Sequence, residues 1–165
     1  MHSQHYTLIK VFRIYALFLL GEDGEKIIYI GKTAGRRISA VYSNHIHGKN
    51  AATEPFFGTE ATERPSLHLL ETLQIATADA YRHVLCWINL FQQKGYRVIN
   101  HEKMQLQASH LRPQALDILK MLPQEDLPEL LMRTRLVRLQ DADFRPLLRP
   151  NRSSLLKKTP SSASG

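Results

Sequence analysis

Two consecutive extended runs joined by a tight turn constrain the fold of this chain most. Residues 8–20 are rich in Ile, Val, Phe, Tyr and Leu, and residues 25–31 repeat this composition. Between them stands Gly-Glu-Asp-Gly, residues 21–24, a combination typical of turns. β-branched and aromatic residues favour strands, so two such runs around a short Gly/Asp segment predict an antiparallel hairpin.

The second run ends in Gly31-Lys32-Thr33, as a phosphate-binding P-loop does. A P-loop also needs a glycine five positions before that glycine, and this chain has Lys26 there. The four residues between, 27–30, are Ile-Ile-Tyr-Ile, which suit a pleated strand and not a flexible loop. The Gly-Lys-Thr ending therefore needs an explanation other than a P-loop.

The rest of the chain alternates between extended and helical patterns. We expect a short helix over 36–44, a loop over 45–65, a third strand over 66–73, a helix from an N-cap at Thr77 to Gly95, and a short extended piece over 96–100. Two leucine-rich amphipathic helices are expected over 112–122 and 126–139, with prolines near their starts. These patterns predict a small α/β (α+β) domain, in which helices flank a three-stranded, largely antiparallel sheet.

The expected organisation has four parts. Residues 1–7 form an N-terminal arm, 8–102 the α/β domain, 103–148 a helical extension, and 149–165 a disordered tail of serine and basic residues.

Charge and cysteine content narrow the function classes. The 165-residue chain carries 22 basic and 15 acidic residues, a net charge of +7, which favours an acidic partner such as nucleic acid. Cys86 is the single cysteine, so no internal disulfide forms and a reducing, cytoplasmic location is expected. The apolar run 11–20 contains Arg13 and is too short to span a bilayer, so we expect no membrane role.

Five features occur in a recognisable order. They are "RIYALFLL" (13–20), "IYIGKT" (28–33), the basic pair Arg36-Arg37, "ADAYRHVLCWI" (78–88) and "GYRVIN" (95–100). Together they resemble the GIY-YIG nuclease domain over roughly residues 8–102, with Arg13 where the family name has Gly and with Ile14-Tyr15 intact.

The resemblance implies a DNA-interacting domain, and a metal-dependent endonuclease that hydrolyses phosphodiester bonds. It assigns water activation and positioning to Tyr15 and Tyr29, which converge if their register places them on one sheet face. A nearby cation would be needed to lower the pKa of such a phenol. It also implies roles for other residues: a phosphate clamp for Arg37 or Arg36, close backbone approach at Gly31, proton handling for His45 or Tyr42, and further substrate contacts for Lys32 and Asn100.

The family binds one divalent metal, Mg²⁺ or Mn²⁺, through a helix glutamate. Val84 stands at that position in this chain, and valine offers no oxygen to a hard cation. The candidate substitutes are Glu71, Asp79 and Glu102, whereas His83 suits a softer metal.

Two other functions remain open. A degenerate member would keep the phosphate-binding surface and act as a nucleic-acid-binding or adaptor protein. Alternatively, the leucine-rich C-terminal helices could bind a protein partner. The matching structural alternatives are cross-strand packing for Tyr15 and Tyr29, and a turn or cap role for Asn100.

Overall fold

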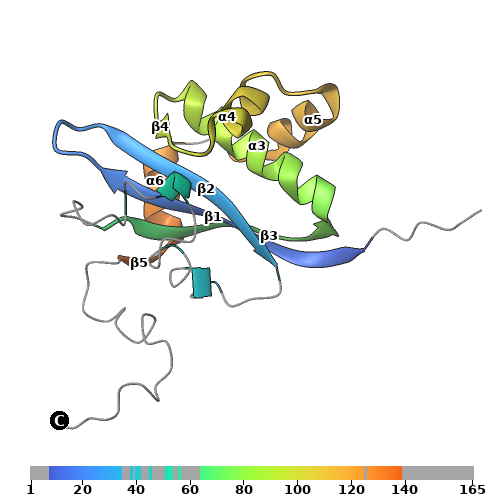
Figure 1. Cartoon of the computed structure of the whole chain (residues 1–165), viewed down its shortest axis with the longest axis horizontal. Helices are drawn as coiled ribbons and strands as arrows, with labels where there is room; N and C mark the ends of the chain where they lie inside the picture. The colour runs from blue at the N-terminus through green and yellow to red at the C-terminus, as the bar shows by residue number, and fades with distance from the viewer. Residues whose placement is uncertain are drawn as a thin grey trace, which may run out of the picture.

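One mixed sheet organises the fold (Figure 1). The computed structural model describes residues 8–34, 38, 40–41, 45, 51–53, 56, 64–124 and 126–138. Its strands are ordered β4-β2-β1-β3-β5. The bounds are β1 Ile9–Leu20, β2 Lys26–Ala34, β3 Ser66–Ala76, β4 Arg97–Val98 and β5 Arg135–Arg138. β1 is antiparallel to both β2 and β3, β4 runs parallel to β2, and β5 runs antiparallel to β3.

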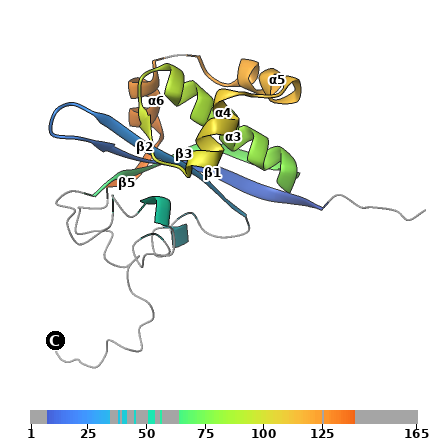
Figure 2. The same cartoon turned by 45° about the horizontal axis from the view of Figure 1, so that its top comes forward.

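Four helices between residues 77 and 134 gather on one face of this sheet. They are α3 Thr77–Gln93, α4 Glu102–Ser109, α5 Pro113–Met121 and α6 Leu127–Thr134. In Figure 2, α3, α4 and α5 stand above the sheet, and the 3₁₀ turn η1 (Ala51–Thr53) lies below it. Within the described ranges, no helix combines the length and apolar character needed to cross a membrane.

Side chains at alternate positions of β1 belong to two different clusters of buried residues. Ile14 and Ala16 belong to the larger cluster, which also contains the buried side of α3. Tyr15 and Leu17 belong to a smaller cluster with Val41 on the opposite face. Successive strand residues point to opposite faces, so the sheet separates a helix-covered face from a tyrosine face.

The prediction of a mixed α/β fold built on a hairpin is confirmed, but the prediction of three strands is wrong. The sheet has five strands, and one pairing is parallel. The two additional strands span two and four residues. Segments this short carry little hydrophobic periodicity, and their pairing with distant strands is what defines them.

Two helix predictions also need correction. The helix expected over 126–139 ends at Thr134, and residues 135–138 form β5. Helix α4 was not expected, because its apolar residues form only a weak stripe. Thr77 is the first residue of α3 and not its N-cap, a position that Ala76 holds without a side-chain hydrogen bond. The expected helix over 36–44 lies largely outside the described residues, as do the arm 1–7 and the tail 149–165.

The residues expected to form a separate helical extension share the main core. Ala108, Ala115 and Leu130 are buried in the same cluster as Trp87 of α3. Nδ1 of His68 in β3 also donates a hydrogen bond to the carbonyl of Leu131, 2.6 Å away. Helices α4 and α5 pack against α3, and α6 packs against β3, so all three helices belong to one core.

Asn100 continues the sheet where β4 stops. Its Oδ1 accepts from the Ile30 N–H at 3.0 Å, and its Nδ2 donates to the Ile30 carbonyl at 2.7 Å. Asn100 and Ile30 are both buried, so the side-chain amide replaces the backbone partner that a longer β4 would supply. This role is structural, but it differs from the turn or cap role that the sequence left open for Asn100.

We expect Asn100→Leu to destabilise the fold through Ile30. The substitution keeps the approximate size of the side chain but leaves a buried N–H and a buried carbonyl unpaired, at about 1–3 kcal/mol for each group. Urea unfolding measures the loss, and faster hydrogen exchange at the Ile30 amide locates it. Gln114→Leu, at an exposed position, is the control, with an expected change within about 0.5 kcal/mol. Equal stability of the two variants would contradict this role.

Candidate functional site

The β1–β2 register brings Tyr15 and Tyr29 onto one face. Tyr15 lies opposite Gly31, and Tyr29 lies opposite Leu17 two positions along the hairpin. The two rings are therefore diagonal neighbours, with centroids 6.3 Å apart. The convergence expected from the sequence is confirmed as a geometric fact.

His45 joins the two tyrosines from a segment distant in sequence. Its Nε2 lies 2.8 Å from the Tyr15 hydroxyl, and its Nδ1 lies 2.8 Å from the Thr53 hydroxyl. The His45 ring also stands edge-on to the Tyr29 ring, with centroids 5.4 Å apart. Tyr15, His45 and Thr53 thus form a buried hydrogen-bonded chain beside Tyr29. Sequence reasoning missed Thr53, because no motif marks it and only the fold brings it to His45.

Burial sets the protonation states of this chain. It raises the pKa of the Tyr15 phenol well above its usual range, and the neighbouring Tyr29 raises it further. Burial also lowers the pKa of His45 to about 4. Both side chains are therefore neutral at pH 7. Tyr15 is held as a phenol that can donate a hydrogen bond, and not as the phenolate that would abstract a proton from water.

Gly31 makes room for the Tyr15 ring. A Cβ added to Gly31 would lie 2.4 Å from both Cζ and the hydroxyl oxygen of Tyr15. Contacts this short cannot be accommodated without moving the ring or the strand. The sequence predicted that this glycine permits close backbone approach, and the group that approaches it in the structure is Tyr15.

Lys32 does not share the face of the two tyrosines. It follows Gly31 on β2 and points to the helix-covered face, where its Nζ lies 5.4 Å from the centroid of the Phe12 ring. Asn100 is not available to a substrate either, because both polar atoms of its side-chain amide form hydrogen bonds with the backbone of Ile30. Of the described residues predicted to bind substrate, Gly31 lies with Tyr15, while Lys32 and Asn100 do not.

The residue at the family's metal-ligand position, Val84, cannot bind a metal ion. Val84 is 1% exposed and packs within the core between α3 and the sheet. That core lies on the face opposite Tyr15 and Tyr29. Across the described part of the chain, no group of three or more His, Cys, Asp and Glu side chains is arranged to hold a metal ion.

The three candidate substitutes are placed elsewhere. Glu71 Oε1 accepts hydrogen bonds of 2.9 Å from both His83 and Trp87 of α3, on the helix-covered face. Asp79 forms an ion pair with Arg82 one turn along α3. Glu102 is exposed at the first residue of α4.

The basic segment after β2, where a helix was expected, lies largely outside the described residues. This applies to Arg36, Arg37 and Tyr42, whose predicted roles stay predictions. Arg13, two positions before Tyr15 on β1, shares the face of Tyr15 because strand side chains alternate. The described part of the tyrosine face therefore includes one permanent cation on the same strand as Tyr15.

Comparison with known proteins adds no family assignment. No protein-family model, no curated protein and no solved structure matches this chain. Its function has to be argued from its own residues.

The contact between Gly31 and Tyr15 predicts a coupled pair of substitutions. We expect Gly31→Ala to cost about 1–3 kcal/mol of stability, since the new methyl overlaps the Tyr15 ring. In a Tyr15→Leu background the overlap is absent, and the same change should cost less than about 1 kcal/mol. Urea unfolding of the four proteins gives both costs. Equal costs in the two backgrounds would show that the ring is not what requires this glycine.

The lowered pKa of His45 predicts a pH-dependent loss of stability. Unfolded histidine titrates near pH 6.5, whereas folded His45 titrates near 4. The unfolded chain therefore binds a proton first as the pH falls. The neutral His45 side chain therefore contributes its full share to the free energy of unfolding above about pH 6.5. As the pH falls towards 4, the free energy of unfolding drops by roughly 1–3 kcal/mol.

Unfolding free energies at several pH values test this expectation. The decline between pH 6.5 and 4 should be shallower in His45→Gln than in the unchanged protein. His110→Gln, at an exposed histidine, should alter the decline less. Parallel curves for His45→Gln and the unchanged protein would contradict the assigned pKa.

Proposed function

We propose that this chain is a DNA-interacting domain of the GIY-YIG type, which holds the phosphodiester backbone at its tyrosine face. The observation that supports the proposal is the assembly of Tyr15, Tyr29 and His45 over Gly31. These residues come from two sequence motifs and one distant segment. Simple cross-strand packing would explain the two rings but does not call for a bonded histidine.

Tyr29 is more exposed to solvent than Tyr15 and His45, so a ligand would contact Tyr29 before the other two. It is half-buried, whereas Tyr15 and His45 are each 4% exposed. The Tyr29 hydroxyl can donate a hydrogen bond to a phosphate oxygen, a common form of contact with the DNA backbone. Tyr15 and His45 contact the Tyr29 ring from its buried side, and they would hold that ring in a fixed orientation.

The charge of the chain supports a polyanionic ligand. The net charge is +7, and Arg13 lies on the face of Tyr15. In the sequence, Arg36 and Arg37 follow Gly31-Lys32-Thr33 after two intervening residues. An arginine fork binds two phosphate oxygens at once, so these residues are the natural clamps for the backbone.

Binding is favoured over metal-dependent hydrolysis for two reasons. The neutral Tyr15 phenol is a poor proton acceptor, and the residue at the family's metal-ligand position is the buried Val84. No hydrolytic step through a metal is therefore derived. Hydrolysis remains a second candidate because the bonded chain from Tyr15 to Thr53 could transfer a proton between neutral groups.

The binding proposal predicts salt-dependent association with DNA. The logarithm of the affinity for a fluorescein-labelled duplex should fall linearly with the logarithm of the salt concentration. Arg37→Ala should reduce the slope by about one, since one phosphate contact is lost. Tyr29→Phe should weaken binding with little change of slope, because a neutral hydroxyl releases no counterion. Lys120→Ala, at an exposed site on α5, is the matched control.

Fluorescence anisotropy measures these affinities. An absence of binding at about 50 mM salt would overturn the proposal, as would equal loss in Lys120→Ala and Arg37→Ala. The same proteins incubated with supercoiled plasmid and Mg²⁺ or Mn²⁺ decide the second candidate. Nicking that disappears in both Tyr29→Phe and Arg37→Ala would establish hydrolysis, and intact plasmid at high purity would exclude it.

A further inference from the structure

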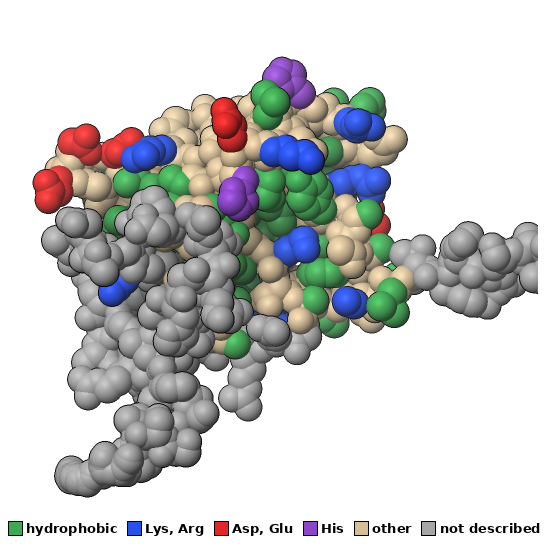
Figure 3. All heavy atoms as spheres, in the orientation of Figure 1, with side chains coloured by type: hydrophobic (Ala, Val, Ile, Leu, Met, Phe, Trp, Pro, Cys, Tyr) green, Lys and Arg blue, Asp and Glu red, His purple; other side chains and the backbone are tan. Residues whose placement is uncertain are grey.

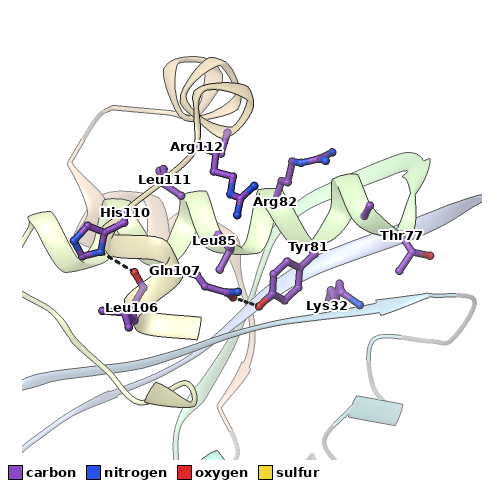
Figure 4. A pocket seen from close by; sticks show the side chains of 12 residues that line it. Lys32, Thr77, Tyr81, Arg82, Leu85, Leu106, Gln107, His110, Leu111 and Arg112 are labelled. Carbon is purple, nitrogen blue, oxygen red and sulfur yellow. Dashed lines mark hydrogen bonds between the residues drawn. The ribbon is translucent and has the colours of Figure 1, made fainter. Parts of the chain in front are cut away.

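A groove of about 730 Å³ lies on the helix-covered face, away from the two tyrosines. Figure 4 shows its side chains converging from β2, from α3, and from α4 with the connection to α5. A hydrogen bond from the Tyr81 hydroxyl to Gln107 Oε1 joins α3 to α4 across it. Several lining residues, such as Lys32 and Arg82, belong to sequence motifs that carry the GIY-YIG resemblance, but the groove lies on the face opposite the proposed DNA site at Tyr15 and Tyr29.

The floor of the groove is apolar. Leu85 of α3, Leu111 before α5 and Ala115 of α5 line it together with Leu106 of α4. Leu106 is 62% exposed, so a large apolar side chain faces solvent at the edge of an apolar depression. A ligand with its own apolar groups would remove this surface from water, at about 25 cal/mol for each Å² covered.

The rim of the groove is cationic. Lys32, Arg82 and Arg112 border it from three different elements, and no acidic side chain occurs among the described residues that line it. Asp79, which is not part of the lining, forms an ion pair with Nη1 of Arg82. In Figure 3, hydrophobic side chains near the middle of the visible face are bordered by Lys and Arg side chains, while most visible Asp and Glu lie to the left.

The start of α3 adds a further preference for negative charge. Thr77 and Ala78 belong to the lining; no side chain caps this helix end, and Asp79 is the acidic residue in its first turn. The first N–H groups of a helix have no intrahelical acceptor, and the helix dipole favours an anion beside them. Three cations and this helix end therefore surround one apolar floor.

We propose that this groove binds an acidic peptide segment of a partner protein. Apolar side chains of the peptide would lie on Leu85, Leu106 and Leu111, and its carboxylates would pair with the cationic rim. An amphipathic helix in a groove between helices is a common mode of peptide recognition. DNA fits less well, because its backbone would pair with the rim and leave the exposed Leu106 uncovered.

Selection from a random peptide library displayed on phage tests the proposal with the full-length chain. We expect enriched peptides to combine Asp or Glu with Leu or Phe. A fluorescein-labelled consensus peptide should then bind about tenfold more weakly to Arg82→Glu/Arg112→Glu. Leu106→Asp, at an exposed position that the core does not need, should weaken binding similarly. Lys94→Glu/Lys120→Glu makes the same charge change at exposed sites outside the groove and should bind within about twofold.

Several results would overturn the proposal. One is a library without an acidic and apolar consensus, and another is a consensus peptide that binds equally well to the groove variants. A third is a labelled single-stranded oligonucleotide that binds the unchanged protein and is lost in the groove variants, since this would make the groove a nucleic-acid surface. Tyr29→Phe separates the two sites: it should retain peptide binding even where DNA binding is weakened.

Discussion

The pairing of β1 on both of its edges is the constraint on which the rest of the structure depends. Because β2 and β3 flank it, β1 cannot rotate, and alternate side chains are committed to opposite faces. Ile14 and Ala16 build the core under α3, while Tyr15 and Leu17 build the tyrosine face. A shift of one residue would exchange the two sets, placing Tyr15 in the core under α3 and Ile14 on the tyrosine face.

The long, strongly patterned elements could be predicted from the sequence for the same reason. β1, β2, β3 and α3 each span nine residues or more, so their hydrophobic periodicity is visible in the sequence alone. The short strands β4 and β5 depend on partners far away in sequence. They are strands because they pair with β2 and β3, and the local amino-acid composition does not predict that pairing.

The candidate site was predictable where strand register determined it. Tyr15 and Tyr29 needed only an antiparallel hairpin of the right register, and His45 was a candidate through the family resemblance. Lys32 shows the limit of motif reasoning: adjacent residues on a strand face opposite ways, so Gly31 and Lys32 cannot serve the same face. Thr53 could not be found, because its contact with His45 arises only when the intervening chain folds.

The contacts of Glu71 show why another acid does not readily replace the metal-binding carboxylate that is missing at Val84. Among the candidate substitutes, Glu71 is the one held within the fold, since its Oε1 accepts from both His83 and Trp87. Turning this carboxylate towards a metal would leave the Trp87 N–H without its acceptor, and Trp87 is fully buried. An unsatisfied buried donor costs about 1–3 kcal/mol. The sheet also separates Glu71 from Tyr15, because Glu71 pairs with Ile14 on the other face. A carboxylate that served the tyrosine face would therefore have to come from that face itself, and not from α3 or the adjoining side of β3.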